Sequence, residues 1–270
     1  MDFLDELESH ILPGDGDLGT LLLDADSGFQ GCPEELCLSQ PELVASLHAQ
    51  YIAAGARVIK TNSLGANAVR LEQHGLANRV NELNWTAARL ARDAAKGKPV
   101  YVAGCVGPLG DTPDNLDRAI LYQEQIGALL DGGAQLIFFA AFLDFDDLAL
   151  ALEIKESLHH CPAIGSLACT PGGRLASGIS LGQAFARLRE VGAAIVGVEG
   201  SPEPPYGLAE LLNAPPSDGL LAAYPAAGDL TAAEFATAAR SLVAQGARLI
   251  GGGPGTRPEH IAALAEAVRS

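Results

Sequence analysis

Three acidic side chains lie where apolar segments end, and carboxylates at such positions suit the binding of positive charge. Asp15 and Asp17 follow an apolar run that begins at Ile11, and Glu199 ends the run at residues 194–198. Carboxylates bind hard metal cations and the ammonium groups of ligands. The alternative is structural, because the same side chains can cap neighbouring loops or accept bonds from backbone N–H groups.

Lys60 is a second candidate for chemistry, since the chain has only four lysines. Strand alternation puts Val58, Lys60 and Asn62 on one face, so Lys60 points inward if Asn62 does. A desolvated lysine can act as a nucleophile and form a Schiff base. The alternatives are an ion pair with Asp15 or Glu199, or an ammonium group that extends to the surface.

A glycine-rich run at residues 251–256 (Gly-Gly-Gly-Pro-Gly-Thr) precedes a predicted helix. The free N–H groups of a helix N-terminus bind phosphate in many barrels, so a phosphate site is one hypothesis for this run. Tyr224 ends another apolar run. With Asn62 it completes the set of candidate ligand-binding side chains.

Short apolar or β-branched runs alternate with longer helical patterns along the whole chain. The eight predicted strands are 11–15, 57–62, 100–104, 136–142, 163–168, 194–199, 220–224 and 248–252. The predicted helices are 41–54, 78–95, 116–131, 146–158, 181–191, 208–212, 231–245 and 259–268. A strict alternation with eight strands predicts a closed (β/α)8 barrel, an α/β fold of the TIM-barrel type, formed by residues 1–270 as a single domain.

Glycines mark the ends of several predicted helices. Gly55, Gly133, Gly192 and Gly246 each stand just before an alanine and the next strand. Glycine adopts the left-handed conformation that closes a helix without steric cost. The repetition of glycine at these helix ends supports the prediction of a barrel.

An open doubly wound sheet is the alternative fold. Gly14, Gly16 and Gly19 match the spacing of the dinucleotide-binding G-x-G-x-x-G motif. That motif must lead directly into a helix, whereas residues 24–28 are predicted to form a loop. The spacing is therefore weak support for nucleotide binding.

Composition narrows the possible partners and location. The chain has 17 basic and 33 acidic residues, which gives a net charge of −16. Such a surface repels phosphate backbones and anionic lipids, so neither nucleic acid nor membrane is an expected partner. No apolar run reaches the roughly 18 residues of a membrane span, and no basic segment followed by an apolar stretch begins the sequence. We therefore expect a cytoplasmic location.

The five cysteines do not form a standard metal motif. Their number is odd, no C-x-x-C is present, and Cys32 and Cys37 are separated by four residues. A chain of this size needs no disulfides for stability, so a reducing compartment is expected.

Six motifs in order carry a family resemblance. They are Asp-Gly-Asp-Leu-Gly-Thr (15–20), Pro-Glu-Leu-Val (41–44), Thr-Asn-Ser (61–63), Gly-Pro-Leu-Gly (107–110), Tyr-Pro-Ala-Ala-Gly (224–228) and Gly-Thr-Arg-Pro-Glu-His-Ile (255–261). Together they resemble the homocysteine S-methyltransferase family, whose members are (β/α)8 barrels. The resemblance covers nearly the whole chain.

The resemblance implies a zinc ion held by three cysteines, which lowers the pKa of the homocysteine thiol so that a thiolate attacks the methyl donor. One cysteine ends a G-x-N-C motif on the sixth strand, and two form G-G-C-C on the eighth. This sequence has Gly200, Gly253 and Pro254 at those three positions. The substrate-clamping Glu of the family's E-T-F motif is replaced by Ala140.

The sequence therefore predicts a family barrel without its zinc site, and no cofactor is expected. It is either a repurposed protein for a small molecule, with methyl-transfer-related chemistry as one option, or a non-catalytic barrel that binds a ligand or a protein partner. The ligand is expected at the C-terminal face of the barrel. Cys105 and Cys169 also follow strands, and a substitute zinc site built from them is a further alternative to two ordinary buried thiols.

Overall fold

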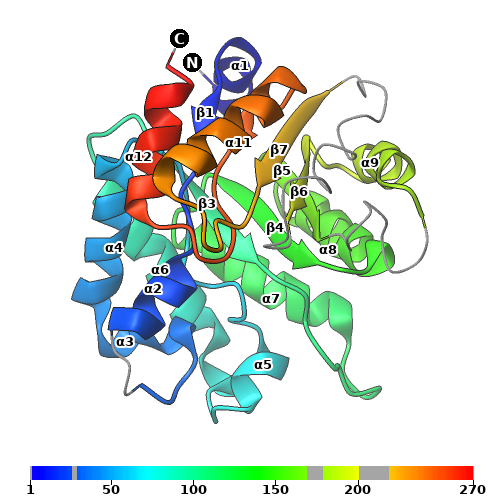
Figure 1. Cartoon of the computed structure of the whole chain (residues 1–270). Helices are drawn as coiled ribbons and strands as arrows, with labels where there is room; N and C mark the ends of the chain where they lie inside the picture. The colour runs from blue at the N-terminus through cyan, green and yellow to red at the C-terminus, as the bar shows by residue number, and fades with distance from the viewer. Residues whose placement is uncertain (1, 26–28, 169–178, 201–218, 270) are drawn as a thin grey trace.

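The structure, a computed structural model, describes residues 2–25, 29–168, 179–200 and 219–269. Eight parallel strands form one sheet in the order β1-β8-β7-β6-β5-β4-β3-β2, and helices surround them (Figure 1). The strands are β1 (Leu12–Pro13), β2 (Val58–Lys60), β3 (Tyr101–Val106), β4 (Leu136–Phe142), β5 (Ala163–Ala168), β6 (Ile195–Glu199), β7 (Leu220–Tyr224) and β8 (Leu249–Ile250).

The barrel closes between β1 and β2. Gly14 forms a parallel bridge with Val58, and the N–H of Asp15 donates to the carbonyl of Val58 at 2.9 Å. The other edge of β1 pairs with β8. This closure confirms the predicted (β/α)8 barrel and excludes the open doubly wound sheet.

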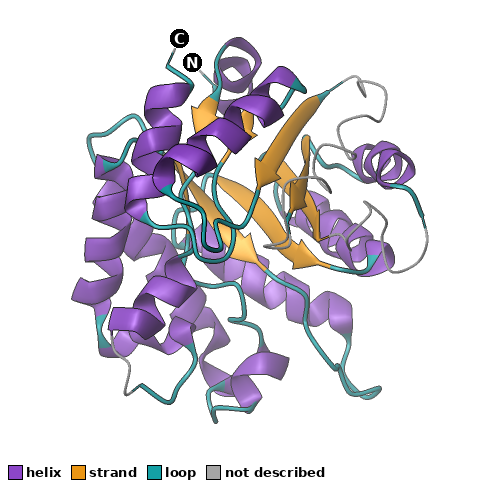
Figure 2. Cartoon of the chain, viewed as in Figure 1, coloured by secondary structure: helices purple, strands orange, loops and turns teal. Residues whose placement is uncertain are grey.

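Helices cover the outside of the strands, as the secondary-structure colouring in Figure 2 shows. They are α1 (Phe3–Ser9), α2 (Leu18–Ala25), α3 (Leu36–Ser39), α4 (Pro41–Ala53), α5 (Ala68–Glu72), α6 (Val80–Ala95), α7 (Arg118–Asp131), α8 (Phe145–Leu158), α9 (Leu181–Glu190), α11 (Ala232–Ala244) and α12 (Pro258–Ala267), with short 3-10 turns η1 (Pro33–Glu35) and η2 (Ala77–Arg79). None of these described helices is long and apolar enough to cross a membrane.

Strand alternation divides the buried residues into two layers. Side chains such as Val58, Phe138 and Ile195 point into the barrel and form an inner cluster. Their sequence neighbours, such as Ile59 and Val196, point outward into a larger cluster with the helices. Both faces of the parallel sheet are thus covered, which explains why the strands are apolar throughout.

Helix α1 closes the N-terminal end of the barrel, which we call the floor. Phe3 and Leu7 of this helix belong to the inner cluster. Glu6 lies between them and accepts hydrogen bonds from Arg57 at 2.6 Å and from the hydroxyl of Tyr101 at 2.8 Å. The opposite end, where the strands terminate, is the mouth.

The strand predictions are confirmed, and those for β4, β5 and β7 match the structure residue for residue. The four glycines predicted to end helices all have φ near +103°, from 102° to 105°. The predicted helix 208–212 lies outside the described residues. Helix α1 and the short helices α3 and α5 were not predicted.

The region after the first strand corrects one prediction. Residues 18–25 form helix α2, although no helix was expected to follow Gly14, Gly16 and Gly19. Leu18, Leu21 and Leu22 give this helix a buried face, and spacing of three and four residues is sufficient to anchor it. This helix does not support the hypothesis of dinucleotide binding, because that hypothesis requires an open doubly wound sheet and the strands here close into a barrel.

Candidate functional site

Asp15 and Lys60 form an ion pair just inside the mouth. Asp15 follows β1, and Lys60 is the last residue of β2, so the closure of the barrel brings them together. One carboxylate oxygen accepts a bond from the Lys60 ammonium at 2.6 Å, and the other accepts from the Lys60 backbone N–H at 2.7 Å. Of the alternatives for Lys60, the geometry shows the pair with Asp15.

The electrostatics of this pair keep Lys60 charged. Burial lowers the pKa of Lys60, but the charge of Asp15 and its hydrogen bond outweigh burial, and the pKa lies above its usual value of 10.5. Burial also raises the pKa of Asp15 against the effect of Lys60. The two bonds that this carboxylate accepts are those of an ionised pair. A charged ammonium is not a nucleophile, so the geometry does not favour a Schiff base.

Aromatic rings support the Lys60 ammonium. Its nitrogen lies 4.2 Å from the centre of the Tyr224 ring and 5.6 Å from that of Phe138. The two rings meet edge to face with centres 4.8 Å apart. A cation over an aromatic face is stabilised by the ring's charge distribution. Tyr224 therefore belongs to the wall of the mouth, as predicted for a strand end.

The glycines around Tyr224 make room for its ring. A side-chain carbon on Gly14 would overlap the Tyr224 hydroxyl, and one on Gly251 would overlap the ring itself. The ring thus spans the inner face from β7 toward β1 and β8. Close packing explains Gly251 without any ligand. The hydroxyl of Tyr224 has no hydrogen-bond partner among the described residues.

Asp17 has a structural role. Its carboxylate accepts a bond from the N–H of Thr20 at 3.2 Å in the first turn of α2. Its other oxygen accepts from the N–H of Gly255 at 3.2 Å. Asp17 therefore caps α2 and links it to the loop after β8. This is the capping role that was the alternative to cation binding for this residue.

Asn62 lies beyond the end of β2 and does not share the inward direction of Val58 and Lys60. Its amide donates to the carbonyl of Pro33 at 2.7 Å and approaches the sulfur of Cys37 at 3.5 Å. These contacts hold the segment before α3 against the strand. The side chain is buried, and its contacts are structural.

Glu199 ends β6 with its side chain on the inner face. It accepts a bond from the N–H of Ala141 at 2.7 Å. Ala141 has φ of 61° and is the one non-glycine residue with positive φ in the described part of the chain. Burial raises the pKa of Glu199, and the charge of Lys60 only partly opposes this. Glu199 thus connects β6 to an irregular end of β4, where the strand register shifts.

The glycine-rich run after β8 does not present free N–H groups. Gly252 donates to the carbonyl of Asp15 at 2.8 Å, Gly253 to that of Pro225 at 2.8 Å, and Thr256 to that of Gly253 at 3.1 Å. Gly255 donates to Asp17, as described above. The hypothesis of a phosphate site on this run is therefore wrong, because its donors are already used within the protein.

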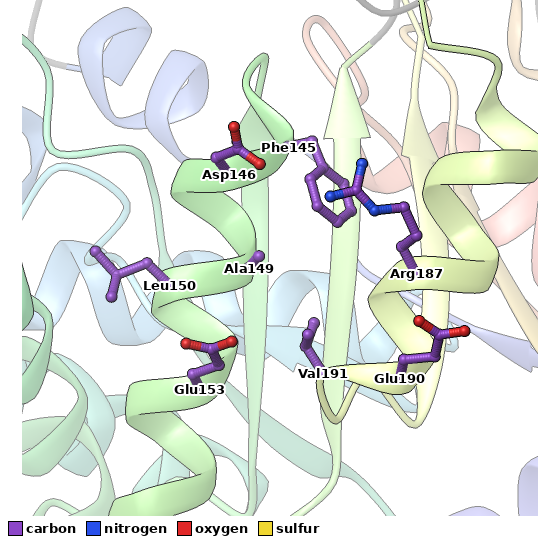
Figure 3. A pocket seen from close by; sticks show the side chains of 8 residues that line it. All are labelled: Phe145, Asp146, Ala149, Leu150, Glu153, Arg187, Glu190 and Val191. Atoms are coloured by element: carbon purple, nitrogen blue, oxygen red, sulfur yellow. The ribbon is translucent and has the colours of Figure 1, made fainter.

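A groove outside the barrel runs between α8 and α9 (Figure 3). It is lined by Phe145, Asp146, Ala149, Leu150, Glu153, Arg187, Glu190 and Val191. The Arg187 guanidinium lies 4.0 Å from the centre of the Phe145 ring. None of the predicted site residues lines this groove, so the candidate site remains at the mouth.

Sequence reasoning did not identify two residues of the mouth. Ser166 is an inner-face residue of β5 that is fully buried and lacks a hydrogen-bond partner in the described structure. A single serine within the apolar segment 163–168 was an available signal. Ala141 carried no signal, because nothing in its local sequence distinguishes a left-handed alanine.

The comparisons with known proteins agree with the barrel fold. Residues 12–268 match the homocysteine S-methyltransferase family. The chain belongs to this family.

Three relatives illustrate the similarity. The metallated form of the homocysteine methyltransferase MmuM from Escherichia coli superposes with a TM-score of 0.80 and 26% identity, over 95% of this chain and 96% of that one. Methionine synthase of Mycobacterium tuberculosis is 30% identical over 301 residues, and that of Mycobacterium leprae is 28% identical over 302. Each alignment covers 99% of this chain but 25% of the methionine synthase, so the chain spans about a quarter of these relatives.

The residues at the implied zinc positions do not fit a zinc ion. Gly200, Gly253 and Pro254 have no side-chain donor. A side-chain carbon on Gly253 would lie 2.9 Å from the Tyr224 carbonyl oxygen, so a cysteine there would require the backbone to shift. Within the described residues no three His, Cys, Asp or Glu side chains are grouped as metal ligands would be.

The substitute site from two cysteines stays a prediction. Cys105 lies on the inner face of β3 and is buried, which raises the pKa of its thiol far above the usual value of 9.0. A raised thiol pKa disfavours the thiolate that binds zinc. Cys169 lies outside the described residues.

Proposed function

We propose that this chain is a repurposed member of the homocysteine S-methyltransferase family, which binds a small molecule at the barrel mouth and does not methylate homocysteine by a zinc-dependent route. The observation that carries the proposal is the donor set at the ends of β6 and β8. Gly200, Gly253 and Pro254 offer no ligand for zinc, and the space at Gly253 is filled by the backbone of β7.

The mouth nevertheless retains polar side chains that a merely structural barrel does not need. Asp15, Lys60 and Glu199 lie on strands β1, β2 and β6 or just after them, at the end of the barrel where the active sites of this fold occur. Their charges influence one another, since Asp15 and Glu199 both act on Lys60. Retained charge at this end supports a ligand site rather than a fully degenerate core.

The test combines metal analysis with methyl transfer on one preparation. Purified protein comprising residues 1–270 is analysed for zinc by mass spectrometry and assayed for methyl transfer to homocysteine, with Escherichia coli MmuM as the positive control. We expect less than one zinc per ten chains and no methionine formed. Stoichiometric zinc together with methylation would refute the proposal.

The same preparation tests the substitute zinc site. If zinc is found, the variant Cys105→Ser with Cys169→Ser decides whether these thiols hold it. Loss of zinc in this variant would establish the substitute site, and retention would exclude it. The proposal expects no zinc in either protein.

A second candidate function is a non-catalytic barrel that binds a protein partner. It is favoured by exposed apolar side chains that follow three adjacent strands at the mouth: Leu64 after β2, Leu116 and Ile120 after β3, and Leu143 after β4. Ile120 and Leu143 are 61% and 60% exposed. Sedimentation of the wild type and of Ile120→Asp tests the simplest partner, a second copy of the chain. A wild-type mass equal to that of one chain at all concentrations would exclude this partner.

A further inference from the structure

Among the described residues, the inner face of the mouth contains one more negative than positive group. Asp15 and Glu199 are carboxylates, and Lys60 is the cation whose charge reaches both of them. Lys60 is paired with Asp15, whose two oxygens accept its ammonium and its backbone N–H, and the ammonium also donates to the carbonyl of Gly16 at 3.5 Å. Among the described residues, Glu199 accepts from one neutral donor, the N–H of Ala141. A carboxylate can accept about four hydrogen bonds, so within the described part of the chain Glu199 has acceptor capacity that is not used.

A second, independent observation lies on the strand beside Glu199. Ser166 of β5 pairs in register with Gly197 of β6, one inner-face position below Glu199. Its side chain is 0% exposed and its hydroxyl has no hydrogen-bond partner in the described structure. Buried polar groups are nearly always paired, and a bound water or ion is one explanation for an exception.

The inner-face residues next to Ser166 are small and closely packed. Gly197 has no side chain, and a carbon added to it would be in contact with the methyl group of Ala222 at 3.3 Å and with Ser166 at 3.4 Å. Glu199 is half-buried and lies two residues further along β6 than Gly197, the register partner of Ser166. Ser166 and Glu199 therefore lie on the same inner face of adjacent strands.

We propose that Glu199 binds the ammonium group of a small primary amine at the mouth, with the hydroxyl of Ser166 as a second acceptor. This inference rests on the proposed function, in which the mouth binds a small molecule without zinc. An ammonium group supplies the missing positive charge and three donors for the unused acceptors. A metal ion is a poorer match, because one free carboxylate and one hydroxyl are too few ligands for a hard cation.

The experiment uses the protein of residues 1–270 and three small probes of similar shape. Binding of n-propylammonium, propan-1-ol and propionate is measured by saturation-transfer NMR titration at neutral pH. The variant Glu199→Gln removes the charge but keeps an oxygen for the Ala141 N–H, so its fold is expected to persist, and thermal unfolding verifies this. Glu153→Gln, in the groove between α8 and α9, is the matched control for loss of a carboxylate elsewhere.

We expect n-propylammonium to bind the wild type and Glu153→Gln equally, and Glu199→Gln at least about tenfold more weakly, because hydrogen bonds to charged groups are stronger than neutral ones. Ser166→Ala is expected to weaken binding about threefold. Propan-1-ol and propionate are expected to bind no better to the wild type than to Glu199→Gln. Equal affinity of the amine for the wild type and Glu199→Gln, or no amine binding to the wild type, would overturn the inference.

The outcome is separable from that of the proposed function. Stoichiometric zinc with homocysteine methylation refutes the proposed function, whatever the amine does. Zinc-free protein that fails to bind the amine refutes only the assignment of Glu199.

Discussion

The polar side chains at the floor and at the mouth of the barrel differ in how completely they are hydrogen-bonded within the described structure. At the floor, Glu6 accepts bonds from Arg57 and Tyr101, and Phe3 and Leu7 of α1 seal the inner cluster. At the mouth, Lys60 pairs with Asp15, whereas Glu199 and the hydroxyls of Ser166 and Tyr224 lack full sets of partners among the described residues. The floor is therefore built for stability, and the mouth retains polar capacity that a ligand can use.

The largest expected effect tests whether the mouth also contributes to stability. Lys60→Met leaves the buried Asp15 carboxylate without its cation, which is expected to cost about 3 kcal/mol of the free energy of unfolding. Urea denaturation measures this loss. Adding Asp15→Asn to Lys60→Met should recover part of it, whereas Lys96→Met at an exposed position should change little. A loss below about 1 kcal/mol would contradict the ion pair.

A change at the floor should reduce stability to a similar degree without affecting ligand binding. Leu7→Ala removes a fully buried side chain of α1 and is expected to cost about 3 kcal/mol, because the cavity cannot fully collapse. Leu143→Ala, at a side chain that is 60% exposed, is the control and should cost less than about 0.5 kcal/mol. Reduced amine binding by folded Leu7→Ala protein would contradict the distinction between a floor that stabilises the fold and a mouth that binds a ligand.

A substitution that relieves the backbone at the mouth is expected to have a smaller effect and to increase stability. Ala141 adopts φ of 61°, and a left-handed conformation costs a residue with a side chain about 1 kcal/mol relative to glycine. Ala141→Gly should therefore stabilise the protein by up to about 1 kcal/mol. Ala238→Gly in the middle of α11 should destabilise it by a similar amount, as thermal unfolding of both variants will measure.

The smallest effect is an opposite pH dependence of the two glutamates. Burial raises the pKa of Glu6, but hydrogen bonds from Tyr101 and Arg57 outweigh it and lower the pKa below 4.5. Its stabilisation is present above the unfolded pKa and is lost as pH falls through the folded one. Burial raises the pKa of Glu199, so its contribution is favourable below pH 4.5 and is lost as pH rises through the folded pKa.

Unfolding measured from pH 3 to 8 separates the two glutamates. Glu6→Gln should be less stable than the wild type at neutral pH, with the difference shrinking toward pH 3. Glu199→Gln should gain stability relative to the wild type as pH rises. The same sign of change in both variants would show that floor and mouth do not differ in this way.

The local sequence predicts the strands and the long helices, but it does not predict every short helix. Gly55, Gly133, Gly192 and Gly246 end helices because no other residue tolerates their φ so readily, and this signal needs no tertiary contact. Helix α2 is not predicted, because residues 24–28 favour a loop and the cap of this helix, Asp17, is held in place by the loop after β8. Helix α1 is seven residues long and is stabilised by its contacts at the floor, which the sequence does not display.

The candidate site was predictable as a set of positions and not as a set of contacts. Strand ends identified Asp15, Lys60, Glu199 and Tyr224. The same reasoning could not separate them from Asp17 and Asn62, whose side chains serve a helix cap and a buried amide contact.

By itself, the sequence determined the alternation of strands and helices, the family, and the absence of cysteine at Gly200, Gly253 and Pro254. These follow from residue type and spacing along the chain. The pairing of Lys60 with Asp15 rather than with Glu199 follows from the three-dimensional fold, because the partner of an inward side chain depends on how the strands close. Asp15 and Lys60 are 45 residues apart, and barrel closure is what brings their charges within 2.6 Å.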